Sequence, residues 1–561
     1  MLKKFTIASL LALPLIFTTG CSKKLGQFSA DYFTVTPNPL ELVGQKVPGT
    51  VTANIPAKFF VKNASVTVTP YLVFDNREVA SQPYSFQGQD VRGNNPVIYY
   101  DRGGMVTIPV SYTWDPAMIN SKLELAFNVN QKGKQYVLPR VQVATGVVAT
   151  AELASAQTVK PAIAPDKFQR VIKEKYAADI KFLVNQANIR DGELKKGEMT
   201  KLQDHMAGAS ISPNQEIEEI NVSSYASPEG ALDFNTRLAQ NREKNTTDYL
   251  NRELRKNNIS FGELTANFTA EDWDGFQKLV QQSNIQDKEL ILSVLSMYKD
   301  PEQREREIRN LSSIFDQLAE DILPQLRYSR ITATINTIGR SDEEIVSTFD
   351  NSPNSLSIDE LLYAATLTDD NNRRMKIYRT ASQLYPDDYR PVNDLGMTQY
   401  IAGDYTGART SFAQAARINP TAAEPQMNLG LISLLDGDFA AADQKFGAAA
   451  GVDELEDALG TSYLLQGDNA AAARAFGNSR SNNAALAQIL TKDYAKAKST
   501  LGAIYDPDAT TYYLTAVLGA RLQNDAMVEK NLRQAIKLDA SLAQRARQDM
   551  EFANYNLSSI L

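Results

Sequence analysis

The chain has 561 residues and a formal net charge of −8. An acidic chain lacks the basic surface that sequence-independent nucleic-acid binding needs, so we expect no nucleic-acid partner. The single Cys and single His exclude a disulfide within the chain, a Cys/His zinc site and a Cys–His catalytic dyad, and we expect neither a metal nor a cofactor.

Residues 1–20 have the pattern of a secretory signal peptide. Lys3 and Lys4 precede an apolar run over 5–17, which at thirteen residues is too short to span a bilayer. The run ends in Thr-Thr-Gly before Cys21, and this arrangement resembles the bacterial lipobox, in which the cysteine after the cleavage site carries lipid. An ordinary signal peptide with an incidental cysteine is the alternative.

The lipobox resemblance implies that lipid on Cys21 holds the mature chain at a membrane through a tether over 21–29. The residues after Cys21 are Ser-Lys-Lys and lack the aspartate that marks inner-membrane retention in enterobacterial lipoproteins. The resemblance therefore implies a lipoprotein of the outer membrane that faces the periplasm.

Residues 30–150 are predicted to form an all-β sandwich. The segments 65–74, 105–114 and 122–129 alternate apolar with polar or small residues, and a Gly-containing turn joins the last of them to 135–138. Short strands with Pro- and Gly-containing turns favour two packed sheets of Ig-like type.

Two prolines and two tyrosines stand out in this β region. Pro70 and Pro109 lie inside strand patterns and predict edge or bulged strands, because proline cannot donate to a sheet. We expect a structural or protein-binding module. A weaker alternative is a carbohydrate-handling role, in which Tyr99 and Tyr100 would form a flat aromatic platform.

A polar linker at 151–167 joins the β region to a central α+β domain over 168–340. A second polar linker at 341–356 joins this domain to a helical region over 357–545, and a tail over 546–561 follows. In the central domain a strand ends near Tyr225, a loop turns at 228–230 and a long helix starts near Asp233. These segments resemble the OmpA-like peptidoglycan-binding domain. The residues at the spacing of that family are Tyr225, Gly230, Asn235, Leu238, Arg242, Tyr249 and Leu250, and its first strand and turn are matched by Phe182, Asn185 and Ile189.

The resemblance implies a peptidoglycan site with one altered position. In the family an arginine pairs with a carboxylate of diaminopimelate in the stem peptide, and a loop aspartate takes its ammonium. The arginine corresponds to Arg242, whereas the aspartate corresponds to Ser227, and we expect the nearby Glu229 to leave the loop in another direction. The implied site is degenerate and consists of Asn185, Tyr225, Ser227, Asn235, Leu238 and Arg242.

A helical insertion over about 280–325 precedes the last strand of this domain, at 330–335. In it, Arg304, Glu305, Arg306 and Glu307 form a run of mixed charge, which we interpret as a solvated helix face.

The helical region repeats with a period of 34 residues. Leu395-Gly396, Ala408 and Phe412 recur as Leu429-Gly430, Ala442 and Phe446, and a third copy contains Gly460 and Phe476. This pattern resembles the tetratricopeptide repeat and predicts an all-α solenoid, in which small residues let paired helices approach and at least three pairs must stack.

Such a solenoid presents a concave groove. The residues predicted to face it are Asn393, Met397, Tyr400, Met427, Leu431 and Leu434. Either this groove binds a protein partner, or these mostly apolar residues pack against another part of the chain.

Catalytic signatures are weak. There is no Walker loop, no dinucleotide turn and no G-x-S-x-G elbow, His205 has the context of a helix-surface residue, and nothing places a substrate beside Glu271 and Asp272. We expect a non-enzymatic adaptor that links the outer membrane to peptidoglycan and recruits protein partners. The alternative is an interaction scaffold of an envelope assembly or secretion complex that has lost peptidoglycan binding.

Overall fold

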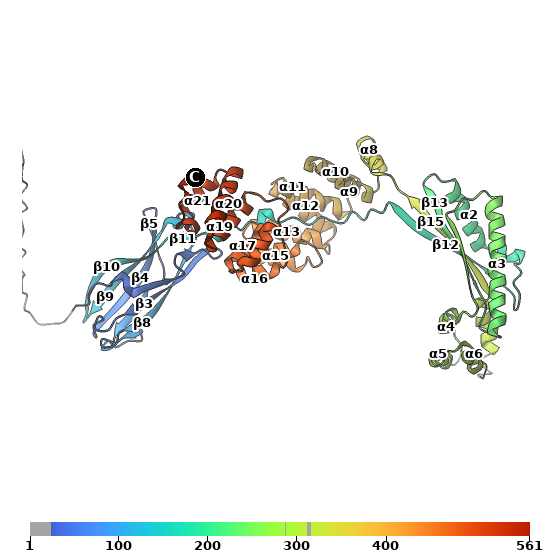
Figure 1. The fold of residues 1–561 in the computed structure, drawn as a ribbon, viewed down its shortest axis with the longest axis horizontal. Helices are drawn as coiled ribbons and strands as arrows, with labels where there is room; N and C mark the ends of the chain where they lie inside the picture. The colour runs from blue at the N-terminus through green and yellow to red at the C-terminus, as the bar shows by residue number, and fades with distance from the viewer. Residues whose placement is uncertain (1–23, 286–287, 311–315, 561) are drawn as a thin grey trace, which may run out of the picture. The chain divides into compact units, whose positions relative to one another are not determined.

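The computed structural model describes residues 24–285, 288–310 and 316–560 (Figure 1). The predicted signal peptide and Cys21 lie outside the described residues. The chain divides into two compact units, of which one combines Met1–Pro165 with Asp370–Leu561 and the other is Asp166–Asp369. The N-terminal strands and the C-terminal helices therefore belong to one unit, although about 200 residues of chain separate them.

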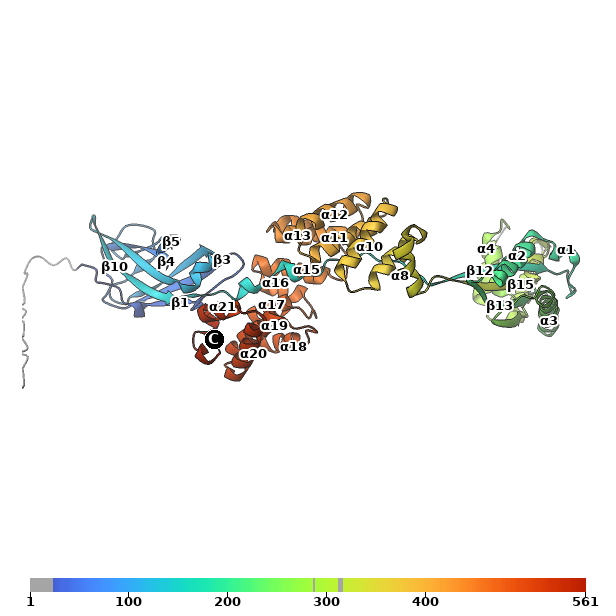
Figure 2. The same cartoon turned by 90° about the horizontal axis from the view of Figure 1, so that it is seen from above.

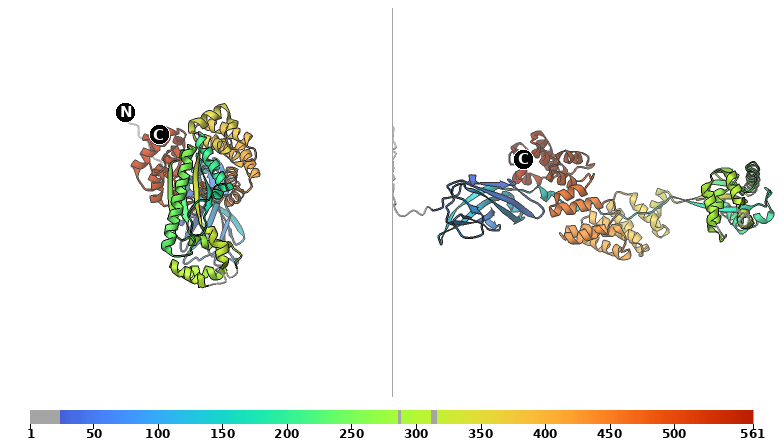
Figure 3. Two further views of the ribbon diagram at one scale, coloured as in Figure 1. Left: turned by 90° about the vertical axis from the view of Figure 1, so that its right-hand side faces the viewer. Right: turned by 90° about the horizontal axis from the view of Figure 1, so that it is seen from below.

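The N-terminal strands, blue in Figure 3, form two main sheets around one apolar core. The first sheet has the order β1-β3-β8 and the second β10-β9-β4-β6-β7, with β5 also paired to β4. A short pair joins β2 to β11. The strands are β1 (Phe33–Thr36), β2 (Leu40–Glu41), β3 (Lys46–Ile55), β4 (Ala64–Phe74), β5 (Arg77–Ala80), β6 (Tyr84–Gly88), β7 (Val97–Ile98), β8 (Gly104–Thr113), β9 (Lys122–Gln131), β10 (Lys134–Thr145) and β11 (Val147–Val148).

Each predicted strand of this region is present, and β4 alternates buried and half-buried residues along its whole length. Pro109 lies on β8, which is an edge strand as predicted. Pro70 differs from the prediction because β4 is central. It lies where the neighbour of β4 changes from β6, paired up to Val68, to β5, paired from Tyr71. Pro70 has no backbone N–H to donate, and it lies at the gap between the two partner strands, where neither strand pairs with it.

The predicted tether over 21–29 is shorter than expected. Leu25 and Phe28 are buried in the core of the strand region, and the ring of Phe28 stacks on that of Phe127 with centroids 4.5 Å apart. An apolar side chain every three residues is enough to dock this segment. Among the described residues, Leu25 is therefore the first that belongs to this core.

The central unit is built on a four-stranded sheet of order β12-β15-β13-β14. Its strands are β12 (Val171–Lys181), β13 (Gln215–Tyr225), β14 (Glu263–Thr269) and β15 (Tyr328–Ile338), of which β13 and β14 are parallel. Helices α2 (Gly197–Ile211) and α3 (Leu232–Lys256) pack on the sheet and share its apolar core (Figure 3). A short helix, α1 (Asp191–Leu194), precedes α2.

The insertion between β14 and β15 is helical, as predicted, and longer than expected. It comprises α4 (Trp273–Gln282), α5 (Lys288–Met297), α6 (Pro301–Asn310), η5 (Leu318–Ile322) and η6 (Leu323–Leu326), with an apolar core of its own. The segment 341–356, predicted as a linker, contains α8 (Asp342–Asn351) because Ser341 and Glu344 form a reciprocal capping box. α9 (Ile358–Thr366), expected to begin the repeats, groups with this unit.

The C-terminal region is an array of paired helices, as predicted. They are α10 (Asn371–Leu384), α11 (Tyr389–Ile401), α12 (Tyr405–Ile418), α13 (Ala423–Leu435), α14 (Phe439–Gly447), α15 (Leu455–Gln466), α16 (Asn469–Ala475), α17 (Asn482–Leu490), α18 (Tyr494–Gly502), α19 (Ala509–Arg521), α20 (Asp525–Leu538) and α21 (Leu542–Gln548). Asp404, Asp438, Asp468 and Asp493 each cap the second helix of a pair through its first free N–H groups. The segment 546–561, predicted as a tail, packs against the helical array. In it Phe552 is buried against Tyr513 of α19, with ring centroids 5.7 Å apart.

The repeated glycines let the two helices of a pair touch. A Cβ atom on Gly430 would lie 2.4 Å from the ring of Phe446, and one on Gly396 would lie 2.7 Å from the ring of Phe412. Each phenylalanine is buried in the space that the glycine leaves. The 34-residue pattern is thus a packing pattern.

We expect Gly430→Ala to destabilise the repeats by about 1–3 kcal/mol, because the extra methyl group overpacks a buried ring. Thermal unfolding of the whole chain, followed by far-ultraviolet circular dichroism, measures the effect. Gly447→Ala is the control, since its Cβ atom meets open space, and helix propensity predicts a small gain. Equal behaviour of the two variants would contradict the close-approach explanation.

Candidate functional site

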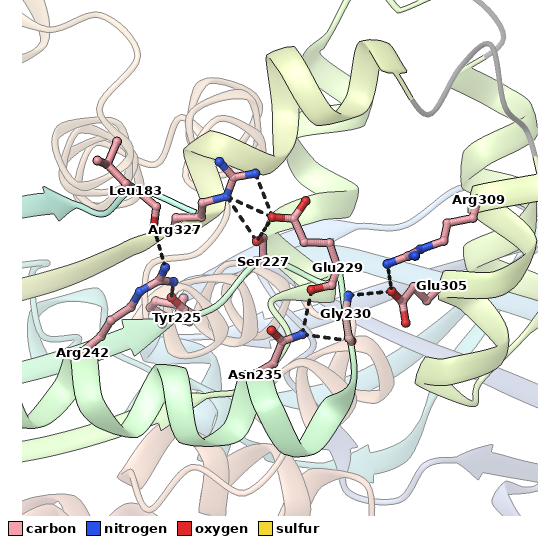
Figure 4. Close-up of polar contacts among 10 residues, drawn as sticks. All are labelled: Leu183, Tyr225, Ser227, Glu229, Gly230, Asn235, Arg242, Glu305, Arg309 and Arg327. Carbon is pink, nitrogen blue, oxygen red and sulfur yellow. Dashed lines mark hydrogen bonds and ion pairs between the residues drawn. The ribbon is translucent and has the colours of Figure 1, made fainter. Parts of the chain in front are cut away.

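The loop that follows β13 brings together most of the residues predicted for the peptidoglycan site (Figure 4). Tyr225 ends β13, Ser227 lies in the loop, and Asn235 and Arg242 lie on α3. Asn235 donates from Nδ2 to the carbonyls of Glu229 and Gly230, both at 3.3 Å, and so fixes the loop on the start of the helix.

Arg242 does not face an open pocket, as the resemblance implied. Its side chain is 0% exposed. Nη1 donates to the carbonyl of Tyr225 at 2.8 Å, Nε to that of Gln186 at 3.0 Å and Nη2 to that of Leu183 at 3.3 Å. The guanidinium also lies 5.0 Å from the ring centre of Phe182. Each nitrogen of the fork is thus bound to backbone, and burial lowers the pKa of Arg242 to about 10.

The position of the family's loop aspartate is filled by an internal ion pair. Ser227 is buried and donates from Oγ to Oε1 of Glu229 at 3.0 Å. The same oxygen accepts from Nη2 of Arg327 at 2.8 Å. The expected direction of Glu229 is therefore wrong: its carboxylate turns back to Ser227 and pairs with Arg327, which directly precedes β15. A carboxylate paired in this way is not free to bind an ammonium group.

The inserted helices close the other side of the loop. Oε1 of Glu305, on α6, accepts from the backbone N–H of Gly230 at 2.6 Å and from Nη2 of Arg309 at 2.5 Å (Figure 4). The Glu305 side chain is 16% exposed. The prediction that Glu305 lies on a solvated helix face is therefore wrong, because its carboxylate binds the loop at the start of α3.

The other predicted residues of this unit lie around the site without joining it. Asn185 is exposed, in a left-handed backbone conformation, and Leu238 is half-buried. Asp272 caps α4 through the N–H of Gly275, and Glu271 accepts from Nε1 of Trp273. Burial raises the pKa of both carboxyls. Asp272 also accepts from the hydroxyl of Tyr328 at 3.5 Å, so the two carboxyls form the start of α4 and lie next to the first residue of β15.

The predicted groove of the helical repeats is occupied by the chain itself. Residues 155–165, here called the strap, run along the groove and lie against α13 and α15 (Figure 2). All six predicted groove residues are buried, namely Asn393, Met397, Tyr400, Met427, Leu431 and Leu434. Of the two interpretations left open by the sequence, the structure supports packing against another part of the chain.

The strap is held through its backbone. Asn428 binds both polar groups of Ala162, accepting from its N–H at 2.7 Å and donating to its carbonyl at 2.8 Å, and Asn393 donates to the same carbonyl at 3.1 Å. Asp394 accepts from the N–H of Ala164 at 2.8 Å. Ala162 and Ala164 are buried, and their small side chains fit where a larger one would collide with the groove.

Further along the strap, Asn483 binds the N–H and carbonyl of Ser155, at 3.1 and 2.7 Å, and Tyr400 donates to the carbonyl of Ala156 at 2.9 Å. Side chains of the repeats thus bind backbone N–H and carbonyl groups of the strap, which begins with a short 3-10 helix, η4 (Ala156–Thr158). Recognition of main-chain groups is the chemistry of a peptide-binding groove.

Asp394 and Asn428 were missed in the sequence although they stand 34 residues apart, at equivalent positions of consecutive repeats. They bind alternate residues of the strap, Ala162 and Ala164. Polar residues at matching repeat positions on otherwise apolar helices are the signal that could have revealed them. Burial raises the pKa of Asp394 to about 8, while the hydrogen bonds from the N–H of Ala164 and from Asn393 act in the opposite direction.

Among the described residues, no helix combines the length and apolar character needed to cross a bilayer. Within the same parts of the chain, no group of three or more His, Cys, Asp or Glu side chains could hold a metal ion.

The chain matches no protein-family model and no curated protein sequence. Several solved structures align with part of this chain at low similarity. The Cut9–Hcn1 hetero-tetramer of the APC/C aligns at 15% identity and a TM-score of 0.32 over 36% of this chain and 44% of that chain, so less than half of that protein is spanned. A tetratricopeptide repeat protein from Parabacteroides merdae aligns at 12% identity and a TM-score of 0.30, over 37% and 91%. PilF of Pseudomonas aeruginosa aligns at 14% identity and a TM-score of 0.28, over 39% and 100%.

Proposed function

We propose that this protein is a non-enzymatic interaction scaffold of the cell envelope, held at the periplasmic face of the outer membrane by lipid on Cys21. The observation that carries the scaffold role is the groove of the repeats, in which asparagine side chains bind backbone N–H and carbonyl groups of the strap. The strap is the internal ligand of this groove, and it joins the N-terminal strands and the repeats into one unit. External partners are then bound by other surfaces of that unit.

We further propose that the central unit is an OmpA-like domain whose wall site is closed. The order of strands and helices and the clustering of Tyr225, Asn235 and Arg242 support the fold. The burial of Arg242, the Glu229–Arg327 ion pair and the bond from Glu305 to the loop argue against binding of a stem-peptide carboxylate and ammonium. Of the two functions considered, the scaffold is favoured over the wall adaptor.

Pelleting with purified peptidoglycan tests this choice. We expect the mature chain carrying Cys21→Ser, which cannot be lipidated, to stay in the supernatant. We expect Ser227→Asp to change nothing, because the new carboxylate would lie beside Glu229 while Arg242 stays bound to carbonyls. Specific pelleting of the parent chain, or a gain of pelleting with Ser227→Asp, would show that the site opens and would restore the adaptor function.

The anchor has a separate test in cells. Labelled palmitate is expected to enter the protein and to be absent from the Cys21→Ser variant, and globomycin is expected to cause the precursor to accumulate. If the parent protein took up no palmitate and its precursor were still cleaved, residues 1–20 would be an ordinary signal peptide.

A further inference from the structure

The N-terminal strand region has one end that carries the start of the folded chain. Only three residues lie between Cys21 and the buried Leu25. Four Cα–Cα steps join Cys21 to Leu25, so the two residues lie at most about 14 Å apart, which is less than two Debye lengths of about 8 Å at physiological ionic strength. A lipid on Cys21 would therefore hold this end within electrostatic reach of the lipid headgroups, and this argument rests on the proposed anchor.

Contacts show which loops share that end. The N–H of Leu25 donates to the hydroxyl of Tyr136, which donates to Gln131 in the β9–β10 turn, and Gln131 in turn donates to Asn63 in the β3–β4 loop. The β6–β8 segment joins them, since the N–H of Lys58 donates to the carbonyl of Tyr100 at 2.5 Å. We call the four segments 24–32, 56–63, 89–103 and 131–134 the basal end.

The opposite end of the strands is not available, because it packs against the helical repeats. There Glu41 lies 3.6 Å from Arg521, and Glu152 lies 3.2 Å from Arg545. The basal end is therefore the end that can face a membrane.

The basal end is basic in an acidic protein. Its four segments contain seven basic residues, namely Lys24, Lys58, Lys62, Arg92, Arg102, Lys132 and Lys134, against three acidic ones, Asp31, Asp90 and Asp101. All seven basic side chains are exposed. The rest of the region, up to Thr150, has four basic and five acidic residues, and the whole chain has a net charge of −8. The positive charge is thus concentrated at this end.

Aromatic rings accompany these charges. Arg102 lies 3.8 Å from the ring centre of Tyr99, and Lys62 lies 5.9 Å from that of Tyr100. The two tyrosines considered as a sugar platform are thus each faced by a cation. Tyr99 is 39% exposed, and Met105, two residues after its bridge partner Gly103, is 67% exposed. Basic, tyrosine and apolar side chains together suit the interface between headgroups and water.

We propose that the basal end is a docking surface for anionic phospholipid headgroups, which sets the orientation of the protein on the membrane to which Cys21 is anchored. Lipid supplies attachment, and the basal end supplies a second, electrostatic contact. Two weak signals acting together are the usual requirement for stable peripheral binding.

Vesicle binding of the mature chain carrying Cys21→Ser tests the surface without the lipid. In low salt, the protein is expected to co-sediment with vesicles of phosphatidylglycerol and phosphatidylcholine and not with pure phosphatidylcholine. Replacing Lys58, Lys62, Lys132 and Lys134 with glutamine is expected to lower the partition coefficient at least tenfold. The matched control replaces the exposed lysines 46, 122, 492 and 498 with glutamine and is expected to leave binding within twofold.

Failure of the unlipidated parent chain to bind the anionic vesicles, equal loss in both variants, or equal binding to neutral vesicles would each overturn the proposal. Because palmitate labelling reports the anchor independently, a labelled protein with an inactive basal end would leave the anchor standing. An unlabelled protein that binds anionic vesicles would support the surface and remove the anchor.

Discussion

Replacing Arg242 with alanine is expected to lower the free energy of unfolding of the central unit by about 3 kcal/mol, because it removes a buried cation and leaves its carbonyl partners unpaired. Those carbonyls belong to Leu183, Gln186 and Tyr225, so the guanidinium joins the segment after β12 to the end of β13. Arg242→Lys is expected to lose somewhat less, since one ammonium group cannot reach all three acceptors.

Native-state hydrogen exchange in the full chain measures this loss locally. Amides of β13 and β15 that exchange through unfolding of the unit should lose about a hundredfold in protection, which corresponds to about 3 kcal/mol. Arg237→Ala is the matched control, since Arg237 is exposed on the same helix and should change stability by no more than about 0.5 kcal/mol. If the amides of β13 and β15 exchanged at the same rate in Arg242→Ala as in Arg237→Ala, the guanidinium of Arg242 would not be a structural part of the fold. A ligand-binding role for Arg242 would then fit best.

Replacing Asn428 with alanine is expected to loosen the strap by about 2 kcal/mol, because two hydrogen bonds to the buried backbone of Ala162 are lost. Asn393 still reaches the carbonyl of Ala162, which limits the loss, whereas its N–H is left unpaired. Exchange of the Ala162 and Ala164 amides should accelerate about thirtyfold, while the amides of β4 keep their protection.

The control for Asn428 is Asn372→Ala. Asn372 is exposed on α10, and its replacement is expected to leave the strap amides unchanged. Faster exchange in both variants would mean that the strap opens with the whole array. No acceleration in Asn428→Ala would mean that apolar packing of Ala162 and Ala164 alone holds the strap, and the backbone-reading groove on which the scaffold role rests would lose its support.

Both sites that the sequence motifs predicted, the groove of the repeats and the loop at the start of α3, are filled by residues of the chain itself. The peptide groove is occupied by the strap, and the loop at the start of α3 is bound by Glu229, Arg327 and Glu305. In each case a side chain expected to meet a foreign ligand meets a segment of its own chain. This is the arrangement expected of a scaffold whose surfaces, rather than its pockets, meet other molecules.

The sequence by itself determined those features that depend on neighbours along the chain. The strands of the first 150 residues follow from alternation, and the helix pairs follow from a 34-residue spacing that places Gly430 against Phe446 within one repeat. The helical insertion was also predicted, because an amphipathic helix carries its pattern in its own residues.

Only the tertiary structure decided what the functional side chains touch. The partners of Arg242 lie 17 to 59 residues away, Glu305 lies 75 residues from Gly230, and Ala162 lies 266 residues from Asn428. Periodicity reports which face of an element is apolar but not which distant segment covers that face. Whether a site was open or filled therefore depended on contacts that the spacing of residues could not encode.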